Sequence, residues 1–112
     1  MSAGTYNLVI DQGSSFALDL AIKQSGSALN LTNYTGRAQL RTSHTASSVA
    51  ATFTVTKTSA SNGTLKMELS PTASANLAAG QYVYDLEIFT ASDAIVKRLL
   101  QGDVTITPEV TR

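Results

Sequence analysis

Two carboxylates, Asp85 and Glu87, are the residues whose type and spacing best suit chemistry. They stand two positions apart in the strand-like segment Tyr82–Phe89, and residues spaced by two share one face of a strand. Paired carboxylates can act as the acid and base of glycoside hydrolysis. They can also contribute to a calcium site, although calcium needs more oxygen ligands than two side chains supply. The alternative, which we favour, is an ion-pair ladder in which Lys97 or Arg98 on a neighbouring strand neutralises them.

The other candidates for chemistry are isolated along the chain. His44 is the only histidine, and the chain has no cysteine, so the usual ligands of a transition-metal site are lacking. The serine pairs Ser14-Ser15 and Ser47-Ser48 lie outside any G-x-S-x-G element, and no glycine-rich phosphate loop is present. We therefore expect no enzyme activity, no metal site and no cofactor.

Composition limits the classes of partner. The 112 residues predict a single domain over 1–112, with 108–112 as a short C-terminal tail. Only 14% of the residues are charged, against roughly 25% in typical soluble domains, and such a polar surface suits packing against other proteins. Eight basic residues balance eight acidic ones, which argues against nucleic acid as a partner. The apolar stretches are too short to cross a bilayer, so no membrane partner is expected, and no small-molecule substrate either.

Alternating apolar and polar residues predict a series of short strands. The predicted strands are Tyr6–Ile10, Phe16–Ile22, Arg37–Thr42, Ala51–Thr56, Leu65–Leu69, Tyr82–Phe89 and Ile95–Thr107. Ser70-Pro71 predicts the start of a short helix that runs to Ala79, and Gly102 predicts a β-bulge in the last strand. The fold class is therefore all-β, with seven to eight strands and one short helix before the penultimate strand.

The segment Leu77–Ile88 specifies this class further. Gly80 can adopt the positive φ that the exit from the helix requires. Tyr82 and Tyr84 follow on one face, and the Tyr82 hydroxyl is expected to bond to backbone near the preceding turn, as in a tyrosine corner. The pattern is typical of the penultimate strand of immunoglobulin-like domains, so we predict a single immunoglobulin-like antiparallel β-sandwich.

Four segments of the chain resemble small virion proteins of tailed bacteriophages. The first contains the Asp11-Gln12-Gly13 turn followed by Phe16, and the second contains Asn30-Leu31-Thr32-Asn33-Tyr34-Thr35. The four segments in order are Thr5–Phe16, Asn30–Arg41, Leu77–Leu86 and Leu99–Thr111. The chain is also similar to the N-terminal domain of baseplate upper proteins.

The resemblance implies a non-enzymatic structural component of a tailed-phage virion, synthesised in the host cytoplasm. Its place would be the tail, baseplate or connector, in contact with other virion proteins and in multiple symmetric copies. Two alternatives stay open. One is a capsid-decorating cement protein, and the other is a host-facing carbohydrate-binding module, which the absence of tryptophan disfavours.

In such an assembly the termini and the edge strands would make the contacts. Residues 1–8 could add a strand to a neighbouring sheet, because exposed strand edges are templates for pairing. Tyrosine is enriched where proteins meet. The candidate interface residues are Tyr6, Leu8, Tyr34, Pro108, Glu109, Val110 and Arg112.

Overall fold

The computed structural model describes residues 4–24 and 26–110, so Arg112 lies outside the described residues. Within these ranges the chain forms ten strands, one α-helix and one 3-10 turn. The strands are β1 (Gly4–Thr5), β2 (Leu8–Asp11), β3 (Phe16–Ala21), β4 (Lys23–Gln24), β5 (Ser27–Ala28), β6 (Thr35–Arg41), β7 (Ala51–Ser59), β8 (Thr64–Leu69), β9 (Gly80–Phe89) and β10 (Val96–Thr107). The helix is α1 (Pro71–Ala75) and the 3-10 turn is η1 (Ala91–Asp93).

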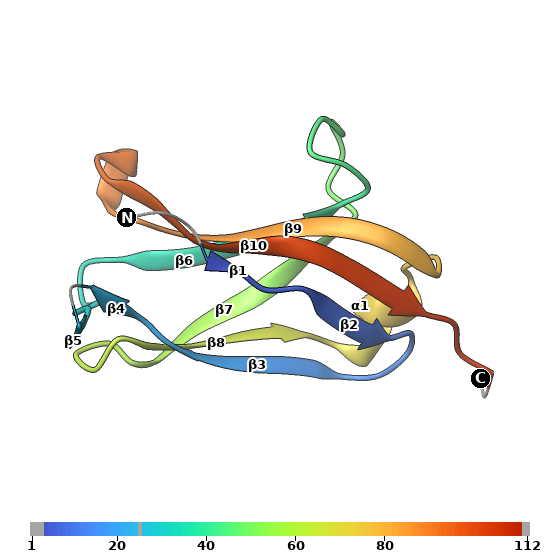
Figure 1. Cartoon of the computed structure of the whole chain (residues 1–112), viewed down its shortest axis with the longest axis horizontal. Helices are drawn as coiled ribbons and strands as arrows, with labels where there is room; N and C mark the ends of the chain where they lie inside the picture. The colour runs from blue at the N-terminus through green and yellow to red at the C-terminus, as the bar shows by residue number, and fades with distance from the viewer. Residues whose placement is uncertain (1–3, 25, 111–112) are drawn as a thin grey trace.

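One mixed sheet curls over to form both layers of the fold. Its strands follow the order β1–β10–β9–β6–β7–β8–β3, with β2 also paired to β10, while β4 and β5 form a separate hairpin. Strand β7 crosses from the layer of β6 and β9 to the layer of β8 and β3 (Figure 1). The predicted all-β, sandwich-like class is confirmed. The sheet is mixed rather than antiparallel throughout, because β1 and β2 run parallel to β10; the immunoglobulin-like assignment stays a prediction.

Period-two alternation fills the space between the layers. On β9 the inward residues are Tyr82, Tyr84, Leu86 and Ile88, all buried. Leu40 of β6 and the residues Leu65 and Met67 of β8 are also fully buried against this row. Burying one such side chain stabilises the fold by about 1.5–3 kcal/mol. The outward residues of β6 and β9 are polar or charged, with the exceptions of Val83 and Phe89.

The N-terminal edge crosses close to β10 at Gly102. A Cβ atom at Gly102 would lie within contact distance of the Tyr6 carbonyl and of Asn7 Oδ1, so a larger residue would push this edge away. The Tyr84 hydroxyl donates to the same Tyr6 carbonyl oxygen. The predicted bulge at Gly102 is therefore wrong: Gly102 pairs regularly with Tyr84, and the register shifts between Arg98 and Leu100 instead.

The turn between β2 and β3 is locked to α1 by buried polar groups. The fully buried Ser74 hydroxyl donates to the Ser14 carbonyl at 2.8 Å and accepts from the Gly13 amide at 3.1 Å. Gln12 Nε2 donates to the Leu77 carbonyl at 2.7 Å, and Gln12 Oε1 accepts from the Glu109 amide at 3.0 Å. These bonds hold the place where the chain passes from one layer to the other.

The local predictions around α1 are largely confirmed. Ser70 caps the helix by accepting from the Ala73 amide at 3.1 Å, and Pro71 occupies the first turn. The helix is shorter than predicted, since it ends at Ala75 rather than at Ala79. Tyr82 donates to the Ala78 carbonyl at 2.7 Å, as expected for a tyrosine corner, and Gly80 has a φ of 145°.

Substituting Gly102 by alanine is expected to destabilise the fold by about 1–3 kcal/mol, because the new methyl group overlaps backbone of the N-terminal edge. Urea unfolding measures the change. Gly4→Ala is the matched control, since a Cβ there meets its neighbours at 3.7 Å or more and φ is ordinary. A Gly102→Ala variant as stable as the Gly4→Ala variant would show that the edge yields without cost.

Ser74→Ala is expected to lower the free energy of unfolding by about 1–3 kcal/mol, since it removes two hydrogen bonds that the fully buried Ser74 hydroxyl makes to the Gly13 amide and the Ser14 carbonyl. The measurement is again urea unfolding. Thr72→Ala, on the exposed side of the same helix, should change stability by less than about 0.5 kcal/mol. Equal effects of the two substitutions would contradict a special role for the Ser74 hydroxyl.

Candidate functional site

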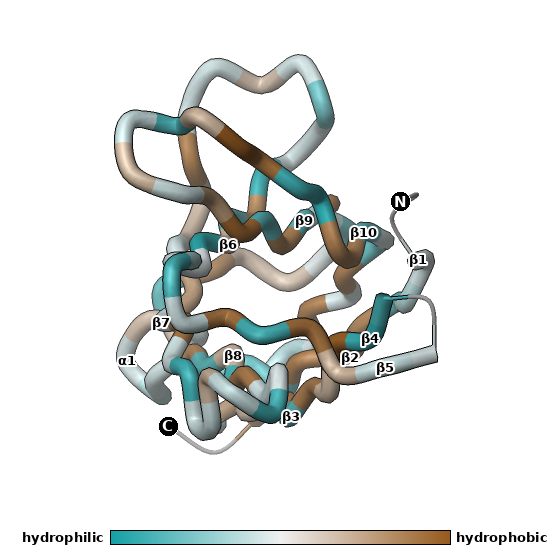
Figure 2. The backbone as a smooth tube through the Cα atoms, turned by 90° about the vertical axis from the view of Figure 1, so that its left-hand side faces the viewer, coloured by the Kyte–Doolittle hydropathy of each residue, from teal (hydrophilic) through white to brown (hydrophobic). Residues whose placement is uncertain are grey.

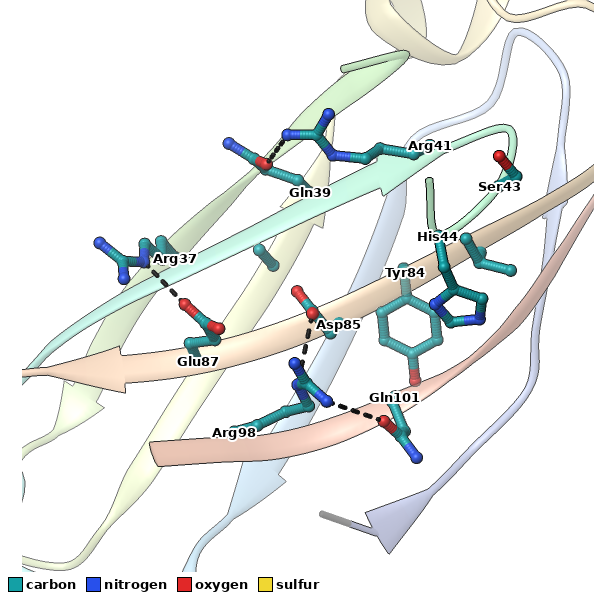
Figure 3. Close-up of a pocket in the computed structure, with 12 residues that line it drawn as sticks. Arg37, Gln39, Arg41, Ser43, His44, Tyr84, Asp85, Glu87, Arg98 and Gln101 are labelled. Carbon is teal, nitrogen blue, oxygen red and sulfur yellow. Dashed lines mark hydrogen bonds and ion pairs between the residues drawn. The ribbon is translucent and has the colours of Figure 1, made fainter. Parts of the chain in front are cut away.

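Three adjacent strands bring polar side chains together on the outer face of the sheet. In the register of β6, β9 and β10, Asp85 lies between Gln39 and Gln101. In the next row, Glu87 lies between Arg37 and Arg98. These rows form the floor of a hollow of about 440 Å³, which we call the polar hollow (Figure 3). Its lining residues are Arg37, Ala38, Gln39, Arg41, Ser43, His44, Val83, Tyr84, Asp85, Glu87, Arg98 and Gln101.

Two loops rise beside this face on the same side of the molecule (Figures 1 and 2). Loop 42–50 joins β6 to β7 and contributes Ser43 and His44 to the hollow. The hairpin 90–95 joins β9 to β10 at the other end and includes η1. Arg41 ties the first loop to the sheet, because its Nη1 donates to the Ala46 carbonyl at 2.9 Å.

Arg37 and Glu87 are held by several interactions. Arg37 Nε donates to Glu87 Oε1 at 2.9 Å, and Arg37 Nη1 lies 3.6 Å from Asp93 Oδ1. The Arg37 guanidinium also lies over the Phe89 ring, 4.3 Å from its centre. The hydrogen bond to Glu87 is the main cause that raises the pKa of Arg37. Both ionised groups of this pair are therefore occupied within the chain.

Asp85 is more loosely held in the centre of the floor. Its Oδ2 lies 3.4 Å from Arg98 Nε, and the two side chains are 40% and 53% exposed. Burial raises the pKa of Asp85, and repulsion from Glu87 raises it further. Attraction to Arg98, His44 and Arg41 opposes these effects without cancelling them. The predicted ion-pair ladder is thus present: Arg98 pairs diagonally with Asp85, and Arg37 pairs with Glu87 directly opposite it.

Arg41 differs from the other two arginines of the hollow. Its Nη2 donates to Gln39 Oε1 at 3.0 Å and its Nη1 to the Ala46 carbonyl, so both acceptors are neutral. Among the described residues, no carboxylate oxygen lies within 4.0 Å of an Arg41 nitrogen. The hollow therefore contains one guanidinium that is fixed in position without an ion pair.

The predicted interface residues of the N-terminal half differ in how exposed they are. Tyr6 is 51% exposed beside the sheet edge. Leu8 is 3% exposed and belongs to the core, so its prediction as a contact residue is wrong: the alternation of β2 turns its side chain inward. Gly4–Thr5 and Leu8–Asp11 pair with β10 of their own sheet. That residues 1–8 add a strand to a neighbour stays a prediction, and residues 1–3 lie outside the described residues. Tyr34 packs partly against the core, and the Lys97 ammonium lies 5.9 Å from its ring centre.

The predicted C-terminal contact residues lie away from the polar hollow. Pro108 and Val110 are exposed, and the Glu109 carboxylate lies close to Gly13. Arg112 is outside the described residues. As contact sites, Tyr6, Tyr34 and this tail stay predictions.

Sequence reasoning identified part of the hollow and missed the rest. Asp85, Glu87 and Arg98 were expected together, and alternation along the predicted strand Arg37–Thr42 puts Arg37, Gln39 and Arg41 on one face. That these two sets lie side by side follows from the pairing of β6 with β9, strands far apart in the sequence. The position of His44 depends on the path of loop 42–50, for which its Ser/Thr-rich sequence carries no signal.

Comparisons with known proteins give a likeness of fold. No family model matches the sequence, and no curated protein matches it. Among solved structures, CopC from Methylosinus trichosporium OB3b is similar with a TM-score of 0.51 and 13% sequence identity. The match covers 94% of this chain and 89% of the CopC chain. At this level of identity the similarity describes the fold alone.

This comparison corrects the function predicted from the sequence. The similar structure, CopC, is a copper-binding protein and not a phage protein, and none of the comparisons points to a phage component, so the prediction of a tailed-phage structural component is contradicted. That function and its two alternatives, the cement protein and the host-facing carbohydrate-binding module, are withdrawn. The family resemblance, the virion location and the absence of enzyme activity stay predictions from the sequence.

The residues of this chain give no support for copper binding. Within 4–24 and 26–110, no group of three or more His, Cys, Asp or Glu side chains is placed to hold a metal ion. The sequence has one histidine and no cysteine, and Met67 is fully buried in the core. In the same ranges, none of the helices has the length and apolar character needed to cross a membrane.

The raised pKa of Asp85 predicts a pH-dependent effect of Asp85→Asn. Between the ordinary pKa of 3.8 and the raised value, the folded state binds more protons than the unfolded state. The contribution of Asp85 to stability is therefore most favourable below pH 3.8 and decreases as pH rises through the raised pKa. Asp85→Asn should melt at an equal or slightly higher temperature than wild type at pH 7, and the difference should vanish in acid.

Thermal melts between pH 3 and pH 8 measure this effect. Asp103→Asn is the control, because it removes an exposed carboxylate of β10 from the same face of the sheet and leaves the Arg98 ion pair in place. A lower melting temperature of Asp85→Asn at pH 7, with recovery in acid, would mean that the pairing with Arg98 outweighs burial.

Proposed function

We propose that this chain is a non-enzymatic binding domain that takes a segment of a partner protein in the polar hollow. One observation carries the proposal: three of the eight basic residues and two of the eight acidic residues of the chain line this single hollow. In a chain with so few charges, such concentration on one face marks a recognition surface. Charged and polar groups of this kind set specificity and orientation between partners.

Binding without catalysis is the function that these side chains favour. A general acid or base must come within hydrogen-bond distance of the proton that it transfers. In the hollow, Glu87 is hydrogen-bonded to Arg37, and Asp85 is paired with Arg98. The serine and histidine of loop 42–50 that line the hollow share no hydrogen bond among the described residues, so a nucleophile activated by a base is not assembled there.

A polypeptide partner fits the shape and chemistry of the surface better than a small molecule does. Small-molecule sites are mostly apolar and enclose their ligand. The polar hollow instead offers guanidinium, carboxylate and amide groups on an open sheet face. Exposed apolar side chains stand on the two flanking loops: Val49 on one, and Ile95 on the other. The two loops lie at opposite ends of β6 and β9, so a polar floor with apolar groups at both ends suits an extended segment that runs along the strands.

Binding of the full chain to an array of immobilised twelve-residue peptides tests the proposal. The array holds equal numbers of acidic, basic, apolar and uncharged polar sequences. Gln101→Trp fills the hollow from its floor, because Gln101 lies opposite Asp85. Thr56→Trp is the matched control on the exposed face of β7, away from the hollow.

We expect a subset of peptides to bind wild type and the Thr56→Trp variant equally, and to lose at least about tenfold in affinity for Gln101→Trp. Both variants must give the same melting curve as wild type for the comparison to count. Binding that survives Gln101→Trp, or an array on which no peptide binds, would overturn the proposed function.

A further inference from the structure

We propose that the Arg41 end of the polar hollow is a carboxylate subsite, which takes a carboxylate of the bound polypeptide. This inference rests on the proposed function and specifies the chemistry of its ligand. The group to be bound is a planar anion with two oxygens, supplied either by an acidic side chain or by a C-terminus. The subsite consists of the Arg41 guanidinium, and Ser43 and His44 of the adjoining loop line the same hollow.

Arg41 has a fixed orientation and N–H donors that its described contacts leave unused. A guanidinium carries five N–H donors, and the described contacts of Arg41 use one on Nη1 and one on Nη2. The acceptors lie on two different elements, since Gln39 belongs to β6 and Ala46 to loop 42–50. The head group is therefore held between sheet and loop before any ligand arrives. Preorganised guanidinium groups bind carboxylates through two parallel hydrogen bonds.

The other two arginines of the hollow provide an internal comparison. Arg37 has carboxylates at 2.9 Å and 3.6 Å, and Arg98 has one at 3.4 Å. Arg41 is partly buried, yet its bonds go to neutral oxygens. A partly buried cation that lacks an ion pair gains more from an incoming anion than one that is already paired. Of the three, Arg41 is thus the one whose charge an incoming anion would neutralise.

The charge of the lining also favours an anion with a single charge. Three guanidinium groups face two carboxylates among the lining residues, and the nearby Asp93 lies beside Arg37. The one positive charge without a paired carboxylate is therefore that of Arg41. Asp85 lies opposite Gln39, whose amide oxygen accepts from Arg41, so a bulky dianion such as phosphate would meet repulsion from Asp85. A peptide carboxylate carries one negative charge, and backbone amides beside it can donate to Asp85.

Nitrogen-15 NMR titration of the full chain tests the subsite. The probes are a capped five-residue peptide with one central glutamate, its glutamine analogue, its lysine analogue, an all-neutral peptide with a free C-terminus, and inorganic phosphate. The readout is the chemical shift of the Arg41 Nε–H and of the Ser43 and His44 amides. Variants are Arg41→Gln, Arg41→Lys and, as control, Lys66→Gln, which removes a positive charge from β8, outside the hollow.

We expect the glutamate peptide to shift these three signals and the glutamine and lysine analogues to leave them unchanged. Arg41→Gln should weaken the interaction at least about tenfold, Arg41→Lys less, and Lys66→Gln little. If Arg41→Gln fails to fold, the comparison of Arg41→Lys with wild type decides. A response to the free C-terminus alone would identify a chain end as the source of the carboxylate.

Three results would overturn the subsite: equal shifts with the glutamine analogue, unchanged binding to Arg41→Gln, or tighter binding of phosphate than of the glutamate peptide. The proposed function is tested separately by the peptide array. Array peptides that bind in the hollow without a carboxylate would refute the subsite and leave the binding domain intact. An array without binders, together with a silent titration, would refute both.

Discussion

The constraint on which this structure depends is the double pairing of β9. Its backbone is hydrogen-bonded to β10 along one edge and to β6 along the other, so it can neither shift nor twist independently. Alternation then assigns Tyr82, Tyr84, Leu86 and Ile88 to the core. A slip of one residue would exchange this row for the row of Asp85 and Glu87. Burial of the apolar row therefore fixes where the carboxylates of the polar hollow stand.

The curled sheet needs its two ends held, because it closes through side chains rather than through a further ladder of backbone bonds. At one end the N-terminal edge lies against β10, in the space left by Gly102, and the Tyr84 hydroxyl holds it there. At the turn from β2 to β3, the side chains of Ser74 and Gln12 hydrogen-bond to backbone groups of Gly13, Ser14 and Leu77. Such contacts between distant segments define the shape that local strand propensity leaves open.

Local features of the fold could be predicted from the sequence because their causes are local. Ser70-Pro71 specifies a helix start, and Tyr82 needs only the turn four residues before it. The parallel pairing of β1 and β2 with β10 could not be predicted, since it joins residues about a hundred positions apart. Leu8 illustrates the limit: its alternation with Val9 is plain in the sequence, but which face is buried depends on that pairing. Half of the hollow was recognisable for the same reason, as the residues of single strand faces.

The composition of the polar hollow is not explained by the needs of folding. Exposed ion pairs add little to stability, and the hollow's ion pairs involve partly exposed side chains. The same sheet shows what an outer face requires when only solubility matters: on β7 it carries Thr52, Thr54 and Thr56. Threonine satisfies β propensity there without the rotamer entropy that a fixed arginine loses. On β6, β9 and β10 the chain instead places arginines, carboxylates and glutamines, and it holds one arginine by neutral acceptors. Because threonines would suffice for a soluble outer face, the charged and amide side chains of β6, β9 and β10 are best explained by what this face binds.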